Sequence, residues 1–412
     1  MERNVYDILE ERGFLKQCSH PEELRELLGR EKVTFYIGFD PTADSLHIGH
    51  YVALMTMAHM QRAGHRPIAL LGGGTAMIAD PSGKTELRKM LTVEELDYNA
   101  SCFQKQMERL VEFGEDKAIM VNNADWLRNL NYMDFMRDIA VHFNVNRMLS
   151  AECYKQRMAS ESGLTFFELG YMLLQSYDFL MLQRRYGCVL EMGGDDQWSN
   201  MLGGVQLIRK KEQKPSFCLT TQLLTNSEGK KMGKTEKGAL WLDEKKCSVF
   251  DFYQYWRNVD DGDVERCLAL LTFLPMEEVK RLGSLKDSAI NEAKRVLAFT
   301  LTEQVHGTEK AKAAQQAAEG LFLGKGDLSN MPTRKLTEAE ILESGMLVPK
   351  LLVLSGLCKS TSDARRMIES GAVFVDEEKV TSFGVTVPVE KLDGDGVILK
   401  KGKKGFCRIC RG

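Results

Sequence analysis

The first half of the chain alternates short apolar runs with longer segments whose apolar residues recur at helical spacing. VTFYIGFD (33–40) is a strand-like run, and residues 46–64 after it have helical periodicity. RPIALLGGG (66–74) and GCVLEMGGDDQW (187–198) repeat the pattern of an apolar strand that ends in glycines. Strands that alternate with helices are typical of a parallel sheet. We therefore expect an α/β domain over residues 1–222.

The helix after the first of these strands has recognisable ends. Ser45 is the expected N-cap and Gly64 the expected C-terminal stop. In open α/β sheets, ligands collect beyond the carboxyl ends of the strands. The polar residues after these three strands are therefore candidates for a binding site.

The second half of the chain has a different pattern. Residues 247–322 lack glycine-rich strand ends and carry periodic apolar and charged positions, which predicts a small helical domain. A lysine-rich, mobile loop over residues 223–246 connects it to the first domain. Residues 323–345 have few large apolar groups and are predicted to be a linker. Residues 346–412 form a third domain, with a helix at SDARRMIESG and strands at AVFVD and KVTSFGVTV.

The segment FFELGYMLLQSYDFLML (166–182) is predicted to be one buried helix. Phe167 and Leu169 are among its apolar positions, yet Tyr171, Gln175 and Asp178 form one polar stripe at i, i+4 and i+7. Buried polar groups need hydrogen-bond partners. The stripe is either a structural network or the wall of a pocket for a polar ligand, and helical spacing leaves both open.

Composition favours a soluble globular protein, with 43% hydrophobic and 27% charged residues. No apolar run is long enough to span a membrane, and the start of the chain is too polar for a signal peptide, so we expect a cytoplasmic protein. The ten cysteines are scattered, which fits reduced thiols. Cys407 and Cys410 have no second ligand pair nearby and are predicted to be small apolar fillers.

Charge is distributed unevenly along the chain. The net charge is −3, but residues 346–412 carry 12 lysines and arginines against 8 acidic residues. The rest of the chain is acidic. This reversal indicates a mildly basic module at one end, which suits contact with an RNA backbone.

The segment SLHIGH (45–50) places His47 and His50 on one side of the first helical turn. Free N–H groups and the helix dipole there favour an anion, to which imidazoles can donate. A metal is the weaker interpretation, because zinc needs three or four ligands. A third interpretation is that the two histidines are simply exposed to solvent at a helix cap. Gly49 favours a ligand, because a helical glycine is costly and leaves room for a flat group such as a base.

Two further segments carry clustered cations. ADPSGKTELRK (79–89) places Lys84 and Arg88 four residues apart after a turn, and EGKKMGKTEKG (228–238) interleaves lysines, including Lys231 and Lys234, with glycines. Each could close over a polyphosphate. Taken alone, each segment is better explained as a solvated polar loop.

Together and in this order, these segments resemble one family. H-I-G-H followed by K-M-G-K-T is the signature pair of class I aminoacyl-tRNA synthetases, with Gly233 and Thr235 in place of the two serines of the consensus. FYIGFDPTADSLHIGH, the Y-x-x-x-Q-x-x-D set and GGDDQW are similar to the bacterial tyrosyl branch. Asp195 departs from the serine common there, and its role is open.

The resemblance covers essentially the whole chain and implies a Rossmann-like catalytic domain, a helical domain that binds the anticodon stem, and a C-terminal RNA-binding domain like ribosomal protein S-four. It implies tyrosine activation by ATP, then transfer of the tyrosyl group to the 3′ end of tRNA(Tyr). ATP would be a substrate that brings Mg²⁺, with no tightly bound cofactor and no metal site. Family members are homodimers, and residues of roughly 120–165 would form the interface.

The resemblance also assigns residues. The substrate phenol would contact Tyr36 and Asp178, its ammonium group Tyr171, Asp80 and Gln175, and its carboxylate Gln197. The nucleotide would contact Gly38, Asp40, Gly194 and Asp196. The triphosphate would be surrounded by Thr42, His47, His50, Lys84, Arg88, Lys231 and Lys234. RNA would contact Lys359, Arg365 and Arg366.

Elementary chemistry agrees with this assignment. A substrate carboxylate that attacks the α-phosphate is already ionised, so the reaction needs positioning and charge stabilisation more than a general base. Three rivals are open. A small nucleotidyltransferase would lack the helical domain and the basic tail, a tryptophanyl enzyme should not carry the Tyr36 and Asp178 pair, and an RNA-binding protein that has lost catalysis would not need the histidines and lysines.

Overall fold

The computed structural model describes residues 3–78, 80, 91–161, 163–235, 238–323, 332–376, 378–394, 396–402 and 405–412, with the backbone alone for Lys234, Thr235 and 320–323. The chain divides into two compact units. The first contains Met1–Asp243 and Glu265–Ser284, and the second contains Glu244–Val264 and Leu285–Gly412. Across the described residues, none of the helices combines the length and the hydropathy that a membrane span requires.

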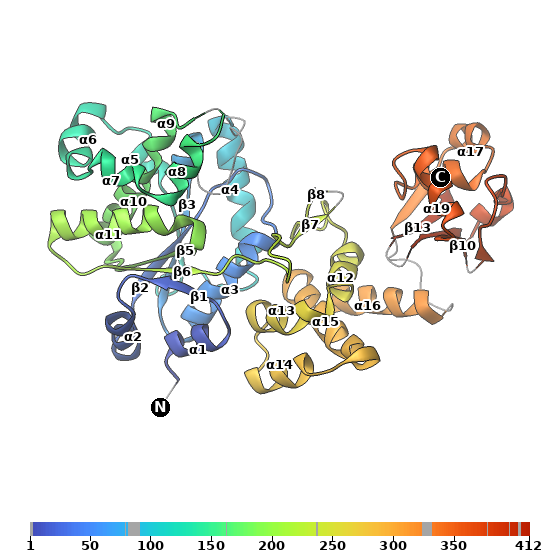
Figure 1. The fold of residues 1–412 in the computed structure, drawn as a ribbon, viewed down its shortest axis with the longest axis horizontal. Helices are drawn as coiled ribbons and strands as arrows, with labels where there is room; N and C mark the ends of the chain where they lie inside the picture. The colour runs from blue at the N-terminus through green and yellow to red at the C-terminus, as the bar shows by residue number, and fades with distance from the viewer. Residues whose placement is uncertain are drawn as a thin grey trace. The chain divides into compact units, whose positions relative to one another are not determined.

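The first unit contains a six-stranded sheet in the order β1-β6-β5-β2-β3-β4 (Figure 1). The strands are β1 (Leu15–Cys18), β2 (Thr34–Phe39), β3 (Arg66–Leu71), β4 (Ile119–Asn122), β5 (Leu190–Gly194) and β6 (Phe217–Thr221). All neighbours are parallel except β1, which pairs antiparallel with β6. The predicted parallel sheet is confirmed. The strand order reverses at the β2–β5 pair, because β3 and β4 are added on one side of it and β6 on the other. In such a sheet the ligand crevice lies beyond the carboxyl ends of this pair of strands.

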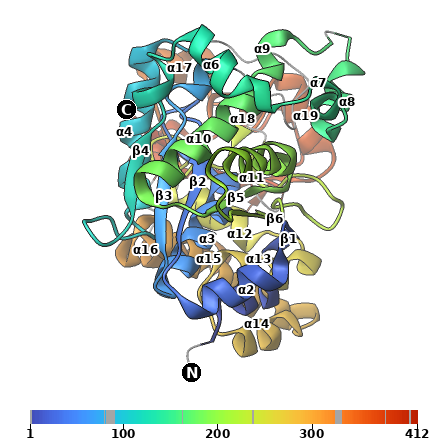
Figure 2. The same cartoon turned by 90° about the vertical axis from the view of Figure 1, so that its left-hand side faces the viewer.

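Helices cover this sheet and position the strand ends. In Figure 2, α10 and α11 lie over one face of the sheet, and the core there includes Tyr36, Ile68, Phe179 and Met201. The larger helices of the unit are α1 (Val5–Glu11), α2 (Pro21–Arg30), α3 (Ile48–Arg62), α4 (Val93–Met107), α10 (Tyr171–Tyr186) and α11 (Trp198–Glu212). Shorter helices are α5 (Ala124–Leu127), α6 (Tyr132–Asp138), α7 (Val145–Leu149), α8 (Glu152–Met158) and α9 (Phe166–Leu169).

The expected single buried helix over residues 166–182 is two helices. α9 ends at Leu169, and α10 begins at Tyr171 after Gly170. Phe166 is 74% exposed and Phe167 43% exposed, so the prediction that Phe167 is buried is wrong. The polar stripe lies wholly on α10.

The start of α3 also differs from the prediction. His47, not Ser45, is the N-cap, because the His47 side chain accepts the backbone N–H of Gly49. Ser45 is buried, and its hydroxyl donates to the carbonyl of Leu46. Gly64 follows the last turn with φ +90°, as expected for a helix stop.

The helices after residue 247 are divided between the two units. α12 (Val249–Arg257), α15 (Ile290–His306) and α16 (Thr308–Leu323) belong to the second unit. α14 (Met276–Gly283) and nearly all of α13 (Val264–Leu271) belong to the first. Buried Arg12 fixes this part, since its guanidinium donates to the carbonyls of Ala269, Thr272 and Leu274. The predicted helical domain is therefore not one compact body.

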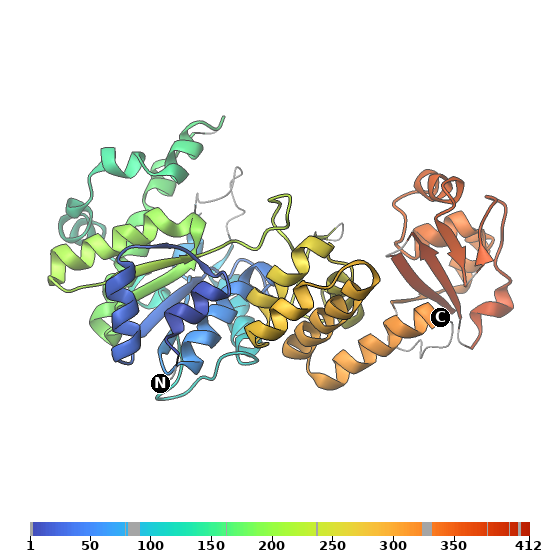
Figure 3. The same cartoon turned by 60° about the horizontal axis from the view of Figure 1, so that its bottom comes forward.

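The C-terminal part carries a five-stranded sheet in the order β11-β10-β12-β13-β9, whose arrows are visible in Figure 3. Its strands are β9 (Thr333–Leu336), β10 (Val373–Val375), β11 (Glu378–Lys379), β12 (Val397–Lys401) and β13 (Gly405–Arg411), and its helices are α17 (Glu338–Ser344), α18 (Val348–Leu354) and α19 (Thr361–Glu369).

Two expectations about this region are wrong. The predicted linker, 323–345, contains β9, which pairs with β13, and α17, whose Ile341 joins the core. The stretch KVTSFGVTV forms little strand, whereas the Gly/Lys-rich end forms β12 and β13. Cys407 and Cys410 are buried on β13 and form no disulfide, and their burial agrees with the prediction that they are small apolar fillers.

Candidate active site

The two histidines of the HIGH segment form the N-terminal cap of α3. The Nδ1 of His47 accepts the backbone N–H of Gly49 at 3.0 Å, and the Nδ1 of His50 accepts the N–H of His47 at 3.2 Å. The rings stack with centroids 3.9 Å apart. A neutral imidazole that accepts at Nδ1 carries its proton on Nε2. Both rings are therefore Nε2–H donors at the positive end of a helix, which suits an anion.

The cap also explains the glycine between these histidines. A Cβ on Gly49 would lie 2.8 Å from Cε1 of the His47 ring. The flat group against this backbone is therefore the His47 imidazole itself. The inference that Gly49 makes room for a base is not needed.

The lysine-rich signature lies directly against the HIGH segment. A Cβ on Gly233 would lie 2.0 Å from Cγ2 of Ile48. Backbone hydrogen bonds join the same segments. The N–H of Leu240 donates to the carbonyl of Gly233 at 2.7 Å, and the N–H of Ile48 donates to the carbonyl of Leu240 at 2.9 Å. Gly233 has φ +81°, which favours glycine. Position and conformation together explain the glycine where the consensus has serine.

The structure describes Lys231 in full but only the backbone of Lys234. Lys231 is exposed and bridges to Thr225. Lys234 lies on β7 (Lys234–Thr235), which pairs with β8 (Gly238–Ala239), but its side chain is outside the description. Lys84 and Arg88 lie outside the described residues altogether.

Asp178 on α10 is held by two neutral donors. Its Oδ2 accepts from the Asn123 amide at 2.8 Å and its Oδ1 from the Trp126 indole at 2.7 Å. The side chain is 2% exposed. Burial raises the pKa of Asp178 to about 8, and these two hydrogen bonds only partly oppose the shift.

A hydrogen-bond chain joins Asp178 to Asp40, beyond the end of β2. Asn123 also donates to the Thr75 hydroxyl at 3.0 Å, and Thr75 donates to Asp40 at 3.1 Å. The Tyr171 hydroxyl donates to the other Asp40 oxygen at 3.2 Å. The structure thus brings three predicted residues together through Asn123, Thr75 and Trp126, which sequence analysis missed. Their signal was present, because Asn123 and Trp126 follow the end of another strand, β4.

Glu191 is a second buried carboxyl that sequence analysis missed. It lies on β5, in register with Tyr36 on β2, and is 2% exposed. Its Oε1 accepts from Nε2 of Gln175 at 2.9 Å. Burial raises the pKa of Glu191 to about 7, and burial together with Glu191 raises the pKa of Tyr36 well above its usual value. Its sequence signal was a charged residue inside the apolar run 188–192.

Three buried polar atoms next to one another lack a partner. Within the part of the chain that the structure describes, the Tyr36 hydroxyl, Gln175 Oε1 and Glu191 Oε2 make no hydrogen bond of good geometry, although the Tyr36 hydroxyl and the Glu191 carboxyl are close enough to shift each other's pKa. Native proteins rarely leave such atoms unpaired. Tyr36 and Glu191 lie on adjacent strands and Gln175 contacts Glu191, so one bound polar ligand is the natural partner of the Tyr36 hydroxyl and of Gln175 Oε1.

Polar residues after β5 complete the site. The Gln197 amide N–H donates to Asp80 at 2.9 Å, and the Gln197 amide oxygen accepts from the Asn200 amide at 3.2 Å. Burial raises the pKa of Asp196, while the nearby Lys231 opposes the shift. A Cβ on Gly194 would lie 2.7 Å from an Asp196 oxygen, so the glycine leaves room for that carboxylate.

Asp195, whose role the sequence left open, has a structural partner set. Its Oδ1 accepts from the Gln17 amide at 2.7 Å and the Thr220 hydroxyl at 3.0 Å. It therefore ties edge strand β1 to β6. Gly38 is exposed on β2, and Thr42 is exposed in the loop that follows.

The predicted RNA-contacting residues lie at α19. Lys359, Arg365 and Arg366 are exposed. Arg366 pairs with Asp363 at 3.0 Å, and the Arg365 guanidinium lies 5.8 Å from the centre of the Phe383 ring.

Comparison with known proteins gives consistent matches. Residues 29–323 match the family of class I tRNA synthetases (W and Y), and residues 326–409 match the tyrosine–tRNA ligase SYY-like C-terminal domain. The chain is 60% identical over 407 residues to a tyrosine–tRNA ligase of Clostridium botulinum (strain Loch Maree / Type A3), covering 98% of this chain and 99% of that one. It is 59% identical over 406 residues to a tyrosine–tRNA ligase of Clostridium kluyveri, with the same coverage.

The fold is similar to a solved structure as well. The crystal structure of a C-terminally truncated mitochondrial tyrosyl-tRNA synthetase of Aspergillus nidulans matches with a TM-score of 0.70 and 28% identity. The match covers 78% of this chain and 95% of that one.

Proposed function

Because this chain belongs to the class I tRNA synthetases (W and Y), we propose that it activates L-tyrosine with ATP and transfers the tyrosyl group to the 3′ end of tRNA(Tyr). The first step forms tyrosyl-adenylate and pyrophosphate. The strongest structural support is the group of unpaired buried atoms of Tyr36, Gln175 and Glu191 beside the Asp178 network. A polar ring substituent would satisfy the Tyr36 hydroxyl, and an ammonium group would satisfy Gln175 Oε1.

The phenol end of the substrate meets Tyr36 and Asp178. Asp178 is an acceptor with lone pairs beyond the two that Asn123 and Trp126 use, and the Tyr36 hydroxyl can both donate and accept. Phenylalanine would leave these buried groups unpaired, so the site rejects it. Tryptophan, the other substrate of the family, offers no hydroxyl here.

The amino acid end meets the other end of the same network. Tyr171, Gln175 and Asp80 hold the ammonium group, and Gln197 lies near the carboxylate. The unpaired Oε1 of Gln175 supports this role, because an amide oxygen is the acceptor that an ammonium group needs.

The nucleotide lies toward the two signature segments. Gly38, Asp40, Gly194 and Asp196 position it, and the phosphates are surrounded by Thr42, His47, His50, Lys84, Arg88, Lys231 and Lys234. The substrate carboxylate attacks the α-phosphate, the bond to pyrophosphate breaks, and negative charge grows on the leaving group. The Nε2–H donors of the stacked histidines stabilise that charge. Mg²⁺ enters with ATP, held mostly by phosphates and water.

The tRNA and a second copy of the chain are the macromolecular partners. Lys359, Arg365 and Arg366 contact RNA, and the helices after residue 247 contact the anticodon stem. A homodimer interface over residues of roughly 120–165 is supported by exposed apolar side chains there and just beyond, namely Tyr132, Met133, Val141, Val145 and Phe166. The enzyme works in the cytoplasm.

Pyrophosphate exchange tests the proposed activity. The purified protein should incorporate labelled pyrophosphate into ATP only when L-tyrosine is present, with phenylalanine and tryptophan slower by several orders of magnitude. Comparable exchange with either amino acid would overturn the substrate assignment. Charging of tRNA(Tyr) with labelled tyrosine then tests the second step.

A further inference from the structure

Glu191 is a buried carboxyl in the proposed tyrosine site that has no assigned role. The parallel register of β2 and β5 places it beside Tyr36, and its Oε2 lies against α11, 3.3 Å from where a Cβ on Gly204 would be. The ionisable side chains that interact electrostatically with Glu191 are Tyr36, Asp178, Cys188 and Cys218. All of these are neutral or acidic, so no cation balances the Glu191 carboxylate among the described residues.

The contact between Glu191 and Gln175 has a defined polarity. A glutamine amide has one end that donates and one that accepts. A carboxylate only accepts, so it selects the amide orientation in which Nε2 points toward Glu191. The opposite end, Oε1, is then left as the acceptor, and that is the atom without a partner.

We propose that Glu191 is a positioning residue, which orients the Gln175 amide so that its oxygen receives the substrate's α-ammonium group. This inference rests on the proposed function, because it presumes that the ligand is an amino acid. Glu191 does not touch the substrate in this role. It acts through Gln175, and it also contributes negative potential toward the ammonium group.

A glutamine at position 191 separates this role from simple packing. It keeps the size and buried position of the side chain, but it can either donate or accept. The Gln175 amide would then be free to turn over and present its NH₂ group to the ammonium group. The expected loss is about tenfold in affinity, the size of one hydrogen bond to a charged group.

The experiment compares three ligands on wild-type protein and Glu191→Gln by equilibrium binding. L-Tyrosine and tyramine carry the ammonium group, and 3-(4-hydroxyphenyl)propanoate lacks it. Glu191→Gln should weaken the first two about tenfold and leave the third within about twofold. In a Gln175→Ala background, Glu191→Gln should have no further effect on any of them.

Asp195→Asn is the matched control. Asp195 also accepts from a glutamine amide, but it joins β1 to β6 instead of lining the network of Gln175. It should leave all three affinities unchanged, and thermal melting verifies that each variant is folded. Equal weakening of all three ligands by Glu191→Gln, additive losses with Gln175→Ala, or no loss at all would each overturn the proposal. Wild-type protein that binds neither tyrosine nor tyramine would instead refute the proposed function.

Discussion

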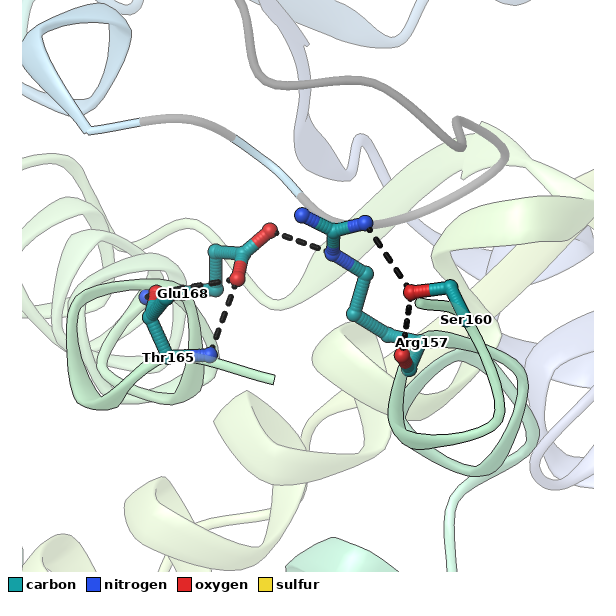
Figure 4. A network of polar contacts seen from close by, with 4 residues as sticks. All are labelled: Arg157, Ser160, Thr165 and Glu168. Atoms are coloured by element: carbon teal, nitrogen blue, oxygen red, sulfur yellow. Dashed lines mark hydrogen bonds and ion pairs between the residues drawn. The ribbon is translucent and has the colours of Figure 1, made fainter. Parts of the chain in front are cut away.

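Two regions of the first unit bury carboxylates in opposite ways. Between α8 and α9, Glu168 pairs with Arg157 at 2.6 Å, and Thr165 donates to it from its backbone and its hydroxyl, as Figure 4 shows. Burial would raise the pKa of Glu168, but these hydrogen bonds together lower it. At the proposed tyrosine site, Asp178 and Glu191 accept only from neutral donors, and burial raises both pKa values.

The difference separates a structural ion pair from the proposed tyrosine site. Arg157 and Glu168 are 3% and 2% exposed and pair with each other, which is what a structural ion pair requires. At the proposed tyrosine site, by contrast, one Glu191 oxygen and the neighbouring Gln175 Oε1 have no hydrogen bond, and neither Asp178 nor Glu191 has a cationic partner among its hydrogen-bond donors. Such perturbed groups mark functional sites when the geometry also leaves room for a ligand.

The largest expected effect comes from breaking the structural pair. Glu168→Gln removes the carboxylate that pairs with the buried Arg157 guanidinium, which should lower the free energy of unfolding by about 3–5 kcal/mol. Urea denaturation measures this. Tyrosine affinity under native conditions should stay within about twofold. A small change in stability would mean that Arg157 finds another partner, and the contrast between the two regions would be weaker.

The second-largest expected effect comes from Asp178 at the proposed tyrosine site. Asp178→Ala removes the acceptor of Asn123, Trp126 and the substrate phenol, so tyrosine-dependent pyrophosphate exchange should fall at least about a hundredfold in kcat/KM. Stability should change little compared with Glu168→Gln, because the removed carboxyl is itself poorly accommodated. If exchange were near normal while the protein became unstable, Asp178 would belong with Glu168 as a structural residue.

The smallest effect is a pH dependence of stability. The folded pKa of Glu191, about 7, lies above its unfolded value of 4.5. Its contribution to stability is therefore fully present below pH 4.5 and is lost as pH rises through 7. Between pH 6 and 8, wild-type protein should lose about 1.4 kcal/mol more than Glu191→Gln. Denaturation of ligand-free protein at both pH values measures the difference, and parallel losses in the two proteins would contradict it.

The sequence by itself determined the parallel sheet, the helix that follows β2 and the family. These depend on local periodicity and on short motifs, which can be recognised without knowing which segments pack against one another. It also indicated Tyr171, Gln175 and Asp178 as one stripe on a helix. It left open whether that stripe satisfies itself or binds a ligand.

Only the tertiary structure supplied the partners of that stripe. Asn123, Trp126 and Thr75 reach the stripe because parallel strands bring distant strand ends together, and Glu191 reaches Gln175 because β5 lies beside β2. No local pattern encodes such contacts.

The same reason explains the other differences from expectation. Gly233 is a glycine because Ile48, far away in sequence, lies where a Cβ would be. The supposed linker contains a strand because β13, some seventy residues later, supplies its partner. Periodicity reports what one segment prefers. Hydrogen-bond partners and close contacts depend on register and packing between segments, and these exist only once the chain is folded.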